Sequence, residues 1–456
     1  MSWQIGRAGQ WLVAAAVWSL MSVIQAARSS DLVAVYELAQ RNDPTFQSAR
    51  HALEAARQKQ PEALSGLLPV LSVNASDSRT GARARYSITP EINRTYNSDQ
   101  WSLQLTQPLF RADRILAYDA SRALVEQAIA QYRAAQQDLM LRTSRAYFDE
   151  IVAERHVAAA HAQVDALNEQ LNAARHSFDA GVASITDVDD TRSRSALAQA
   201  QLVSARNDLE SAIAGIESII GEPPDTLLPL RDEVTLPTPQ PADAASWVQR
   251  ASEENPAVRA ARAVVKGADY ELDRSHSQRL PAVDLVASYG GNYSGGNVTD
   301  PVNFGTNVRD KQITVQLSMP LLDGGGMQAA VAEARAQRSK AQSDLTAAQR
   351  QAALDARQSF SAALSGASQV LALQAAVSAG QNAVKGNRIG YTMGIRINSD
   401  VLNAEQQLFS SMQDLDKARY DTMFAGLKLK AAAGILTEED LSAVNALLRQ
   451  QIPGSP

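Results

Sequence analysis

The sequence of 456 residues contains no cysteine. This absence excludes disulfide bonds, thiolate metal sites, a cysteine nucleophile and lipidation of an N-terminal cysteine. Aromatic residues are also scarce, at 5% of the chain, whereas Ala, Gln, Ser and Leu are abundant. Such a composition favours long helices that pack through small side chains over a globular core of bulky ones. Stability must therefore come from helix packing and from association between copies.

The chain also lacks a recognisable catalytic or metal-binding pattern. Gly324-Gly-Gly326 is not followed by the Lys-Ser/Thr of a phosphate-binding loop. The histidines show no i, i+4 pair and no accompanying ligand pattern; they are His51, His156, His161, His176 and His276. We expect no enzyme, no cofactor and no metal site. The net charge of -6 gives no indication of nucleic-acid binding or of a basic patch for a membrane surface.

Long hydrophobic runs are confined to the N-terminus. Arg7 precedes an apolar run from Trp11 to Ile24, and small residues follow at Ala26 and Ala27. This pattern predicts a signal peptide over residues 1–26. The alternative is a membrane anchor, but about 14 apolar residues are fewer than the ~20 that span a bilayer as a helix. No later segment reads as a transmembrane helix, so a membrane-embedded part would have to consist of strands.

Four segments alternate between apolar and polar residues. They cover about 70–79, 100–109, 282–290 and 312–321. In each segment the apolar residues share one face and Ser, Thr, Gln or Asn occupy the other, which predicts amphipathic strands. About 10 residues is the length of a tilted strand that crosses a bilayer. Polar loops are expected between the members of each pair, over 79–98 and 290–310.

Very long helices are predicted beside these strands. Residues 112–180 contain neither Pro nor Gly, and a second stretch of similar length begins after Asp323-Gly-Gly-Gly326. At 1.5 Å per residue, each helix would be on the order of 100 Å long. The end of the first helix carries apolar residues at alternating spacings of three and four, which is the pattern of a coiled-coil seam. The seam residues are Val164, Leu167, Leu171, Ala174 and Phe178.

The chain is a duplication with an offset of about 212 residues. Pro44 matches Pro256, and Pro69 matches Pro281. Six prolines within 222–242 indicate a semi-rigid connector between the two copies. The expected organisation is a signal peptide at 1–26, repeat 1 at 31–221, the connector at 222–244, repeat 2 at 245–434 and a C-terminal tail at 435–456.

A glycine turn ends the long helix of each repeat. Phe178-Asp-Ala-Gly-Val-Ala-Ser-Ile-Thr-Asp187 is matched 213 residues later by Tyr391-Thr-Met-Gly-Ile-Arg-Ile-Asn-Ser-Asp400. Gly181 and Gly394 occupy equivalent positions in these two turns. The two stretches are therefore equivalent tips of helical hairpins.

The strands constrain the assembly of the chain. Four strands cannot close a barrel, and open strand edges are not tolerated in lipid. Two copies would give eight strands, whose side chains fill the interior, whereas three copies would give twelve and leave a lumen filled with water. The polar faces of the strands favour the barrel of twelve strands, because they would line its lumen. Long helices attached to these strands would extend the conduit far beyond the membrane. The expected fold is a mixed α/β membrane protein with a twelve-stranded β-barrel continuous with an α-helical barrel.

These features together resemble the TolC family of outer-membrane channel proteins, over essentially all of the sequence after the signal peptide. The resemblance rests on motifs that are weak singly but specific in this order and duplicated spacing. They are Asn42-Asp-Pro44 and Glu254-Asn-Pro256 at helix starts, Leu68-Pro69 and Leu280-Pro281 before strands, Gln107-Pro-Leu-Phe110 and Met319-Pro-Leu-Leu322 after strands, and the two tips.

The resemblance implies a homotrimer in the outer membrane of a Gram-negative bacterium with a periplasmic helical tunnel. It also implies an equatorial belt formed by residues 222–244 and the tail from about 435. The implied partners are a periplasmic adaptor (a membrane-fusion protein) and an inner-membrane transporter, either an ABC transporter or a proton-driven pump. The cargo would be an exported protein or a small toxic molecule.

Asp31-Leu-Val-Ala-Val-Tyr-Glu-Leu-Ala39 resembles the branch of the family that serves type I protein secretion. The missing lipidation cysteine also argues against the lipid-anchored multidrug-pump branch. A drug-efflux channel remains the alternative function. A periplasmic coiled-coil scaffold or adaptor remains the alternative of another class, although four alternating strands speak against it.

In the family, the second-repeat tip closes the periplasmic entrance. The resemblance assigns Tyr391 and Arg396 as latch donors to Thr186 and Asp187, and it assigns Asp400 to a ring of carboxylates at the constriction. The best-known member has a second acidic position three residues after this ring, whereas this chain has Asn403. A trimer would therefore present three carboxylates where six might be expected. The alternative is that the latch residues are ordinary caps and surface residues of a helix turn.

Overall fold

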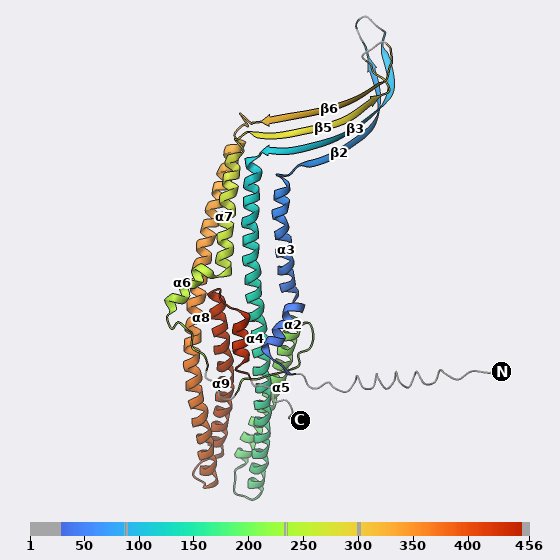
Figure 1. The fold of residues 1–456 in the computed structure, drawn as a ribbon. Helices are drawn as coiled ribbons and strands as arrows, with labels where there is room; N and C mark the ends of the chain where they lie inside the picture. Colours follow the sequence, from blue (N-terminus) through green and yellow to red (C-terminus); the bar gives the residue numbers. More distant parts are fainter. Residues whose placement is uncertain are drawn as a thin grey trace, which may run out of the picture. The chain divides into compact units, whose positions relative to one another are not determined.

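The computed structural model describes residues 29–448 apart from 86, 88, 89, 232, 233, 235 and 299–301. The predicted signal peptide and the last eight residues of the predicted tail lie outside the described residues. The chain divides into two compact units (Figure 1). The helical unit comprises Met1–Ala49, Arg133–Asn255 and Arg350–Pro456, and the strand unit comprises Arg50–Tyr132 and Pro256–Gln349.

The strand unit contains a four-stranded antiparallel sheet. Its strands are β2 (Val70–Ala84), β3 (Ile92–Phe110), β5 (Ala282–Ser294) and β6 (Thr306–Ser318), in the order β2-β3-β5-β6. The two hairpins expected from the duplication therefore lie side by side, joined through β3 and β5. The outer edges of β2 and β6 have no partner strand in the part of the chain that the structure describes. The sheet is open at both edges.

The strands are longer than the sequence predicted. β3 begins at Ile92 and not near residue 100, and the β2–β3 ladder continues to the pair Ala84 and Ile92. β6 begins at Thr306 and ends at Ser318, before the predicted end at 321. The added ladder carries polar residues on both faces, with the pair Arg83 and Asn93 on one face and Arg94, opposite Ala82, on the other. Because such a segment has no apolar alternation, its sequence resembles a loop.

Helices join the sheet at one end within the strand unit. They are α3 (Pro44–Ser65), α4 (Ala112–Asp179), α7 (Pro256–Ser277) and α8 (Gly326–Thr392), of which α3, α4 and α8 continue into the helical unit. Arg111, between β3 and α4, donates two hydrogen bonds of 3.1 and 2.6 Å to the carboxylate of Asp284 on β5. Lys266 on α7 forms an ion pair of 2.8 Å with Glu126 on α4. These pairs fix the base of the sheet and the helices beside it.

The helical unit is built from two helical hairpins with short elements around them. α5 (Ile185–Ile220) follows α4, and α9 (Asn398–Ala432) follows α8. The short elements are α2 (Leu32–Asn42), α6 (Ala244–Glu254), α10 (Glu438–Asn445), β1 (Ser29–Ser30) and β4 (Thr226–Leu227). Four of the five predicted seam residues of α4 are buried, whereas Phe178 is 41% exposed because it lies at the very end of the helix.

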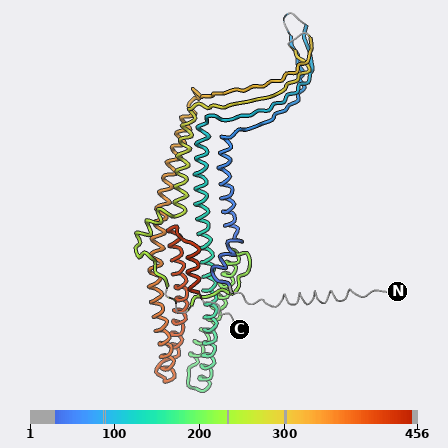
Figure 2. The backbone as a smooth tube through the Cα atoms, in the orientation of Figure 1, coloured from blue at the N-terminus to red at the C-terminus, as the bar shows by residue number. Residues whose placement is uncertain are grey.

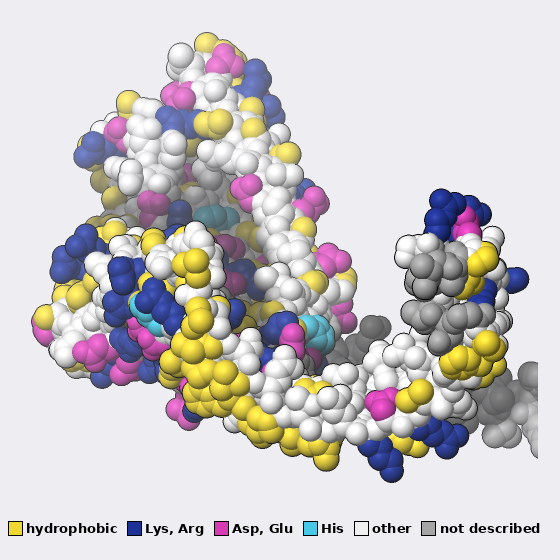
Figure 3. Space-filling view, turned by 90° about the horizontal axis from the view of Figure 1, so that it is seen from above, with side chains coloured by type: hydrophobic (Ala, Val, Ile, Leu, Met, Phe, Trp, Pro, Cys, Tyr) yellow, Lys and Arg dark blue, Asp and Glu magenta, His cyan; other side chains and the backbone are white. Residues whose placement is uncertain are grey.

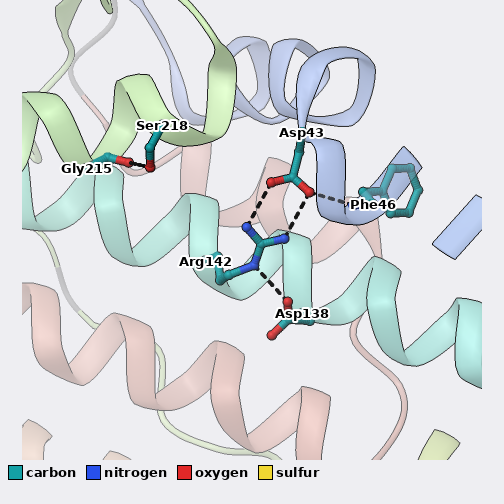
Figure 4. A network of polar contacts seen from close by, with 6 residues as sticks. All are labelled: Asp43, Phe46, Asp138, Arg142, Gly215 and Ser218. Carbon is teal, nitrogen blue, oxygen red and sulfur yellow. Dashed lines mark hydrogen bonds and ion pairs between the residues drawn. The ribbon is translucent and has the colours of Figure 1, made fainter. Parts of the chain in front are cut away.

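The Asn42-Asp-Pro44 motif anchors the start of α3 to α4 (Figure 4). Asp43 is 2% exposed and accepts hydrogen bonds from Arg142 at 2.9 and 3.1 Å and from the backbone N–H of Phe46 at 2.6 Å. Burial opposes ionisation of Asp43, but the hydrogen bonds from Arg142 and from the backbone of Phe46 and Thr45, together with the charge of Arg142, outweigh it and hold the pKa of this carboxyl below its usual value. Repeat 2 has Asn255 at the equivalent position, and its amide donates to the carbonyl of Ala432 at 2.9 Å.

The proline-rich connector is held against the long helices by tyrosine hydroxyls. Tyr147 on α4 donates to the carbonyl of Leu228 at 2.9 Å, and Tyr420 on α9 accepts from the N–H of Leu230 at 3.1 Å. Leu230 also forms an isolated antiparallel bridge with Leu448, so the connector meets the C-terminal tail. The tail itself contains a helix, α10, between residues 438 and 445.

One helix differs from the expectation that no later segment is apolar enough to span a membrane. α8 contains an 18-residue window with a mean hydropathy of 1.3 that is only 17% buried in the chain. The helix is 67 residues long and runs from the base of the sheet to a glycine turn. Alanine accounts for much of this hydropathy, and small side chains let helices pack closely. The same composition is therefore found in helices that pack against other helices and in helices that span a membrane.

Candidate functional site

The two glycine tips lie at the same end of the helical unit (Figure 2). The first tip, residues 180–184, joins α4 to α5, and the second tip, residues 393–397, joins α8 to α9. Gly181 and Gly394 have φ values of 75° and 74°. Only glycine adopts this left-handed conformation without cost, which explains its presence in both copies. In both turns the glycine N–H donates to the carbonyl three residues before it, and the next N–H donates to the carbonyl five residues before it, so the two turns share their backbone hydrogen bonds.

The first tip satisfies its polar groups locally. Ser184 is the N-cap of α5, and its hydroxyl accepts a hydrogen bond from the N–H of Thr186 at 3.2 Å. The carboxylate of Asp187 accepts a hydrogen bond from the N–H of Ser184 at 3.3 Å. This reciprocal arrangement is a capping box. Asp187 and Thr186, the predicted latch acceptors, thus already serve the start of their own helix.

The second tip has no equivalent cap. Ile397 occupies the N-cap position of α9 and provides no side-chain hydrogen bond. Asp400, the equivalent of Asp187, instead forms an ion pair of 3.6 Å with Arg396. The Arg396 side chain crosses Gly390 so closely that a Cβ there would lie 2.7 Å from its Cγ. Tyr391 is 37% exposed. The polar side chains of this tip are therefore held loosely.

Within one chain the structure does not bring the predicted latch together. Among the described residues, no hydrogen bond or ion pair joins Tyr391 or Arg396 to Thr186 or Asp187. Their role as a latch remains a prediction about assembled copies.

Other side chains do connect the second repeat to the first near the tips. The amide of Asn398 on α9 donates to the hydroxyl of Thr191 on α5 at 2.9 Å, and both residues are buried. One turn farther along, Arg194 on α5 donates to the amide oxygen of Asn403 at 2.9 Å and to that of Gln406 at 3.2 Å. Asn403, predicted as a neutral neighbour of the carboxylate ring, is thus a hydrogen-bond acceptor for the first repeat.

A buried carboxylate forms the centre of a second connection. Glu405 on α9 is 5% exposed. One of its oxygens accepts hydrogen bonds from Arg388 on α8 at 2.9 and 2.7 Å, and the other accepts from the amide of Gln170 on α4 at 2.6 Å. We call Arg194, Asn398 and Glu405, with the partners just named, the inter-repeat ties. They link the end of α9 to both helices of the first repeat.

Comparison with known proteins identifies the family of this chain. The family model described as "Outer membrane efflux protein" matches residues 35–222 and 247–435. The chain belongs to this family. Members of the outer membrane efflux protein family with similar sequences include the alkaline protease secretion protein AprF of Pseudomonas aeruginosa, which is 32% identical over 416 residues, or 90% of this chain and 86% of that protein. The outer membrane protein TolC of Escherichia coli K12 is 29% identical over 96% of this chain and 89% of its own length.

Solved structures of outer-membrane channels have the same fold. VceC from Vibrio cholerae superposes with a TM-score of 0.75 at 18% identity, and covers 88% of this chain and 96% of that protein. CmeC from Campylobacter jejuni gives a TM-score of 0.76 at 16% identity, with 91% and 88% covered. The predicted TolC-type fold with duplicated repeats is confirmed. As a member of this family, the protein is an outer-membrane channel with a periplasmic helical part.

The inter-repeat ties were missed by sequence reasoning. Asn398 and Glu405 are seven residues apart and flank Leu402, which is 2% exposed. Two polar residues on a buried stripe of a coiled coil are a usable signal, because buried polar groups require partners. Their partners could not be named, because Thr191 and Gln170 lie on other helices and look like ordinary surface residues in the sequence.

The acidic residues of the tips do not form a metal site within one chain. No group of three or more His, Asp or Glu side chains suited to a metal ion occurs among the described residues. The side chain of Asp400 is 35% exposed, which leaves it open to ions in solvent. In a single chain the tip therefore supplies charged and hydrogen-bonding groups and no cluster of metal ligands among its described residues.

Proposed function

We propose that this protein is the outer-membrane exit channel of a type I protein secretion system. It would act as a homotrimer with a periplasmic adaptor and an inner-membrane ABC transporter. The observation that carries the proposal is the four-stranded sheet with two open edges, because open edges are incompatible with lipid. Three copies would give twelve strands and a lumen lined by the polar strand face.

Two similar proteins support secretion as the role. AprF is named for alkaline protease secretion, and PrtF of Dickeya chrysanthemi, 28% identical over 92% of this chain and 91% of its own length, is named for secretion of proteases. A drug-efflux channel is the second candidate, favoured by the similarity to the outer membrane efflux protein BepC of Brucella suis at 27% identity over 97% of this chain. The scaffold or adaptor alternative does not fit membership of a channel family.

A deletion strain separates secretion from efflux. Loss of the gene should remove one or a few proteins from the culture medium, with the same proteins retained in the cell, and should leave sensitivity to dyes and detergents nearly unchanged. Complementation with the wild-type gene should restore export. A strain with unchanged secreted proteins and strongly raised drug sensitivity would instead establish the efflux function.

The second tip is the proposed gate of this channel. In the trimer, Asp400 would form the acidic constriction, Asn403 its neutral neighbour, and Tyr391 with Arg396 the latch to Thr186 and Asp187. The inter-repeat ties support the proposal, since they already attach α9 to the first repeat within each chain. Opening would then require α8 and α9 to part from α4 and α5.

A further inference from the structure

One face of the sheet changes character along its length. The register aligns Leu105 with Ala287 and Ile313 in one row, and aligns Leu103 with Tyr289 and Lys311 in the next row. Trp101, Gly291 and Arg309 form the third row. Successive rows on this face lie two residues apart, as a pleated strand requires. The face therefore passes from aliphatic to aromatic and basic residues within a few rows.

The apolar rows lie nearer to the helices. Ile313, Val315 and Leu317 on β6 are 64–79% exposed and lie between Lys311 and the end of the strand that leads to α8. The opposite face of β6 carries Gln312, Thr314 and Gln316, the polar face expected toward a lumen. Figure 3 shows hydrophobic side chains gathered along one side of the sheet, with Lys and Arg side chains following them toward its far end.

Two aromatic rings mark the edge of the apolar rows. Trp101 and Tyr289 pack edge to face with their ring centroids 5.3 Å apart. The indole of Trp101 lies over Gly291, where a Cβ atom would come within 2.7 Å of its Nε1 atom. Lys311 places its Nζ atom 5.4 Å from the centroid of the Tyr289 ring. Aromatic rings at such a level are typical of the boundary between lipid tails and headgroups in outer-membrane barrels.

Three cations lie at or just beyond the aromatic rings. They are Lys311, Arg309 and Arg79, which we call the basic collar, and all three are exposed. Neither Arg309 nor Arg79 has a hydrogen bond or an ion pair with another residue in the described part of the chain. Asp77 and Asp99 form the row between that of Arg309 and that of Arg79, so the collar is not uniformly basic, but its three cations outnumber these two carboxylates. The collar therefore carries a small net positive charge beside an apolar surface.

The position of the collar determines which molecules can bind to it. The helices of this family of channels are periplasmic, so the ends of the strands away from the helices point out of the cell. An adaptor or transporter binds in the periplasm and cannot reach this end. We propose that the basic collar binds the phosphate groups of a lipid headgroup in the outer leaflet, while Trp101 and Tyr289 lie at the level where its acyl chains begin.

A lipid fits this surface better than a free phosphate ion. The cations stand directly beside exposed apolar rows, so one molecule with acyl chains and a phosphorylated headgroup can contact both. A free ion would gain only exposed contacts with mobile side chains, which are weak in water. The proposal rests on the outer-membrane location and is independent of which cargo the channel exports.

The test is a lipid titration of the purified full-length protein in detergent. Diphosphoryl lipid A is added to delipidated protein, and bound lipid is counted by native mass spectrometry, with phosphatidylcholine as a second probe. The wild type should bind lipid A more tightly than phosphatidylcholine. The double variant Arg309→Gln with Lys311→Gln should bind lipid A roughly 30-fold more weakly, given about 1 kcal/mol for each cation at a lipid surface.

Two further variants keep the result interpretable. Arg335→Gln with Lys340→Gln removes the same charge from the exposed surface of α8 and should leave lipid A binding unchanged. Arg309→Lys with Lys311→Arg keeps the charge and should retain binding. The proposal is overturned if the glutamine variant binds like the wild type, if the charge-keeping variant loses binding equally, or if excess inorganic phosphate displaces the lipid completely. Single-channel conductance should be the same in all variants, so failure of this proposal leaves the export function untouched.

Discussion

The two tips of the helical hairpins share a backbone but differ in the use of their side chains. In the first tip, Ser184 and Asp187 close a capping box, so the start of α5 is satisfied by residues within the same turn. In the second tip, Ile397 replaces the capping serine, and Asp400 is left with a single ion pair to Arg396. The same duplicated template therefore gives one self-contained turn and one turn that depends on other helices.

This difference indicates which tip can move. Side chains that cap their own helix stabilise the turn in any position of that helix, because they move with it. The inter-repeat ties behave differently, since the hydrogen bonds of Asn398 to Thr191 and of Gln170 to Glu405 exist only while α9 stays against α5 and α4. Arg388 on α8 would stay with Glu405, but one oxygen of this buried carboxylate would lose its partner, which is costly. If the second tip is the gate, as proposed, its release would require these ties to be replaced by water or by a partner.

Of the changes that distinguish the two tips, removal of the inter-repeat ties should have the largest effect on single-channel conductance. The double variant Arg194→Ala with Glu405→Ala deletes the side chains that hold α9 to α5 and α4. We expect single-channel conductance in planar bilayers to rise several-fold, because α9 keeps only the tie from Asn398 to Thr191, while the capping box of the first tip stays intact. Arg206→Ala with Glu210→Ala, two exposed residues of α5, is the matched control. A conductance equal to that of the control in intact trimers would show that the ties do not hold the gate.

The predicted latch should have a smaller effect. Tyr391→Phe with Arg396→Ser removes donors that form no hydrogen bond or ion pair with the first repeat within one chain. The variant also breaks the ion pair of Arg396 with Asp400, so an effect beyond that of Asp400→Ala must come from contacts between assembled copies. We expect conductance to increase, but less than on loss of the ties, and the two sets of changes to add when combined. Phe178→Leu, a change at the equivalent position of the first tip, should leave conductance as it is. If the latch variant also conducts like the wild type, the assignment of Tyr391 and Arg396 fails.

The sequence was sufficient for the architecture because its signals are periodic. Alternation identified all four strands, and the absence of Pro and Gly identified α4, which runs from Ala112 to Asp179. It was insufficient for the polar ends of the strands, where both faces are hydrophilic and the period of two disappears. It was also insufficient for the ties, because the partners of Glu405 come from helices far apart in the sequence. Likewise, the overall charge of -6 concealed the basic collar, since a few cations on one face of a sheet scarcely change a sum over the chain.

The carboxylate of the second tip should govern block by divalent cations. A ring of three Asp400 side chains in the proposed trimer would attract a multivalent counter-ion, whereas Asp187 is occupied in its capping box. Asp400→Ala should therefore raise the concentration of divalent cation that halves the conductance. Asp189→Ala, which removes an exposed carboxylate from α5, should not. Equal block in the wild type and in Asp400→Ala would exclude this residue from the constriction.

Exchanging the caps should alter stability and leave the closed conductance nearly unchanged. Ser184→Ala removes the capping hydroxyl of the first tip and should lower the free energy of unfolding by about 1 kcal/mol. Ile397→Ser introduces a hydroxyl at the equivalent exposed position, where Asp400 could complete a capping box, and should raise it by a similar or smaller amount. Thermal unfolding followed by circular dichroism measures both. The two variants must change the free energy of unfolding in opposite directions. A loss of stability in both would contradict the proposed equivalence of the turns.

The smallest effect is expected at Glu150, a buried carboxylate that lacks the hydrogen-bond partners of Glu405. Glu150 on α4 is 9% exposed, and its Oε2 atom has no hydrogen-bond partner among the described residues, whereas both oxygens of Glu405 are paired. Burial, with a smaller contribution from the charge of Glu154, raises the pKa of Glu150 to about 7. Below the pKa of the unfolded chain, near 4.5, the group is protonated in both states and has no effect on stability. As the pH rises toward about 7 the unfolded state is favoured increasingly, and above that pH the full cost of the buried charge is present.

Glu150→Gln should therefore raise the melting temperature by a few degrees at pH 8 and leave it unchanged at pH 4. Glu405→Gln should do the opposite at pH 8, because it weakens a carboxylate that accepts hydrogen bonds from Arg388 and Gln170. Thermal melts of both variants and the wild type at the two pH values make the comparison. If the two glutamine variants shift the melting temperature in the same direction at pH 8, then burial and not pairing determines the behaviour of these carboxylates, and the ties lose their special role in holding the second tip.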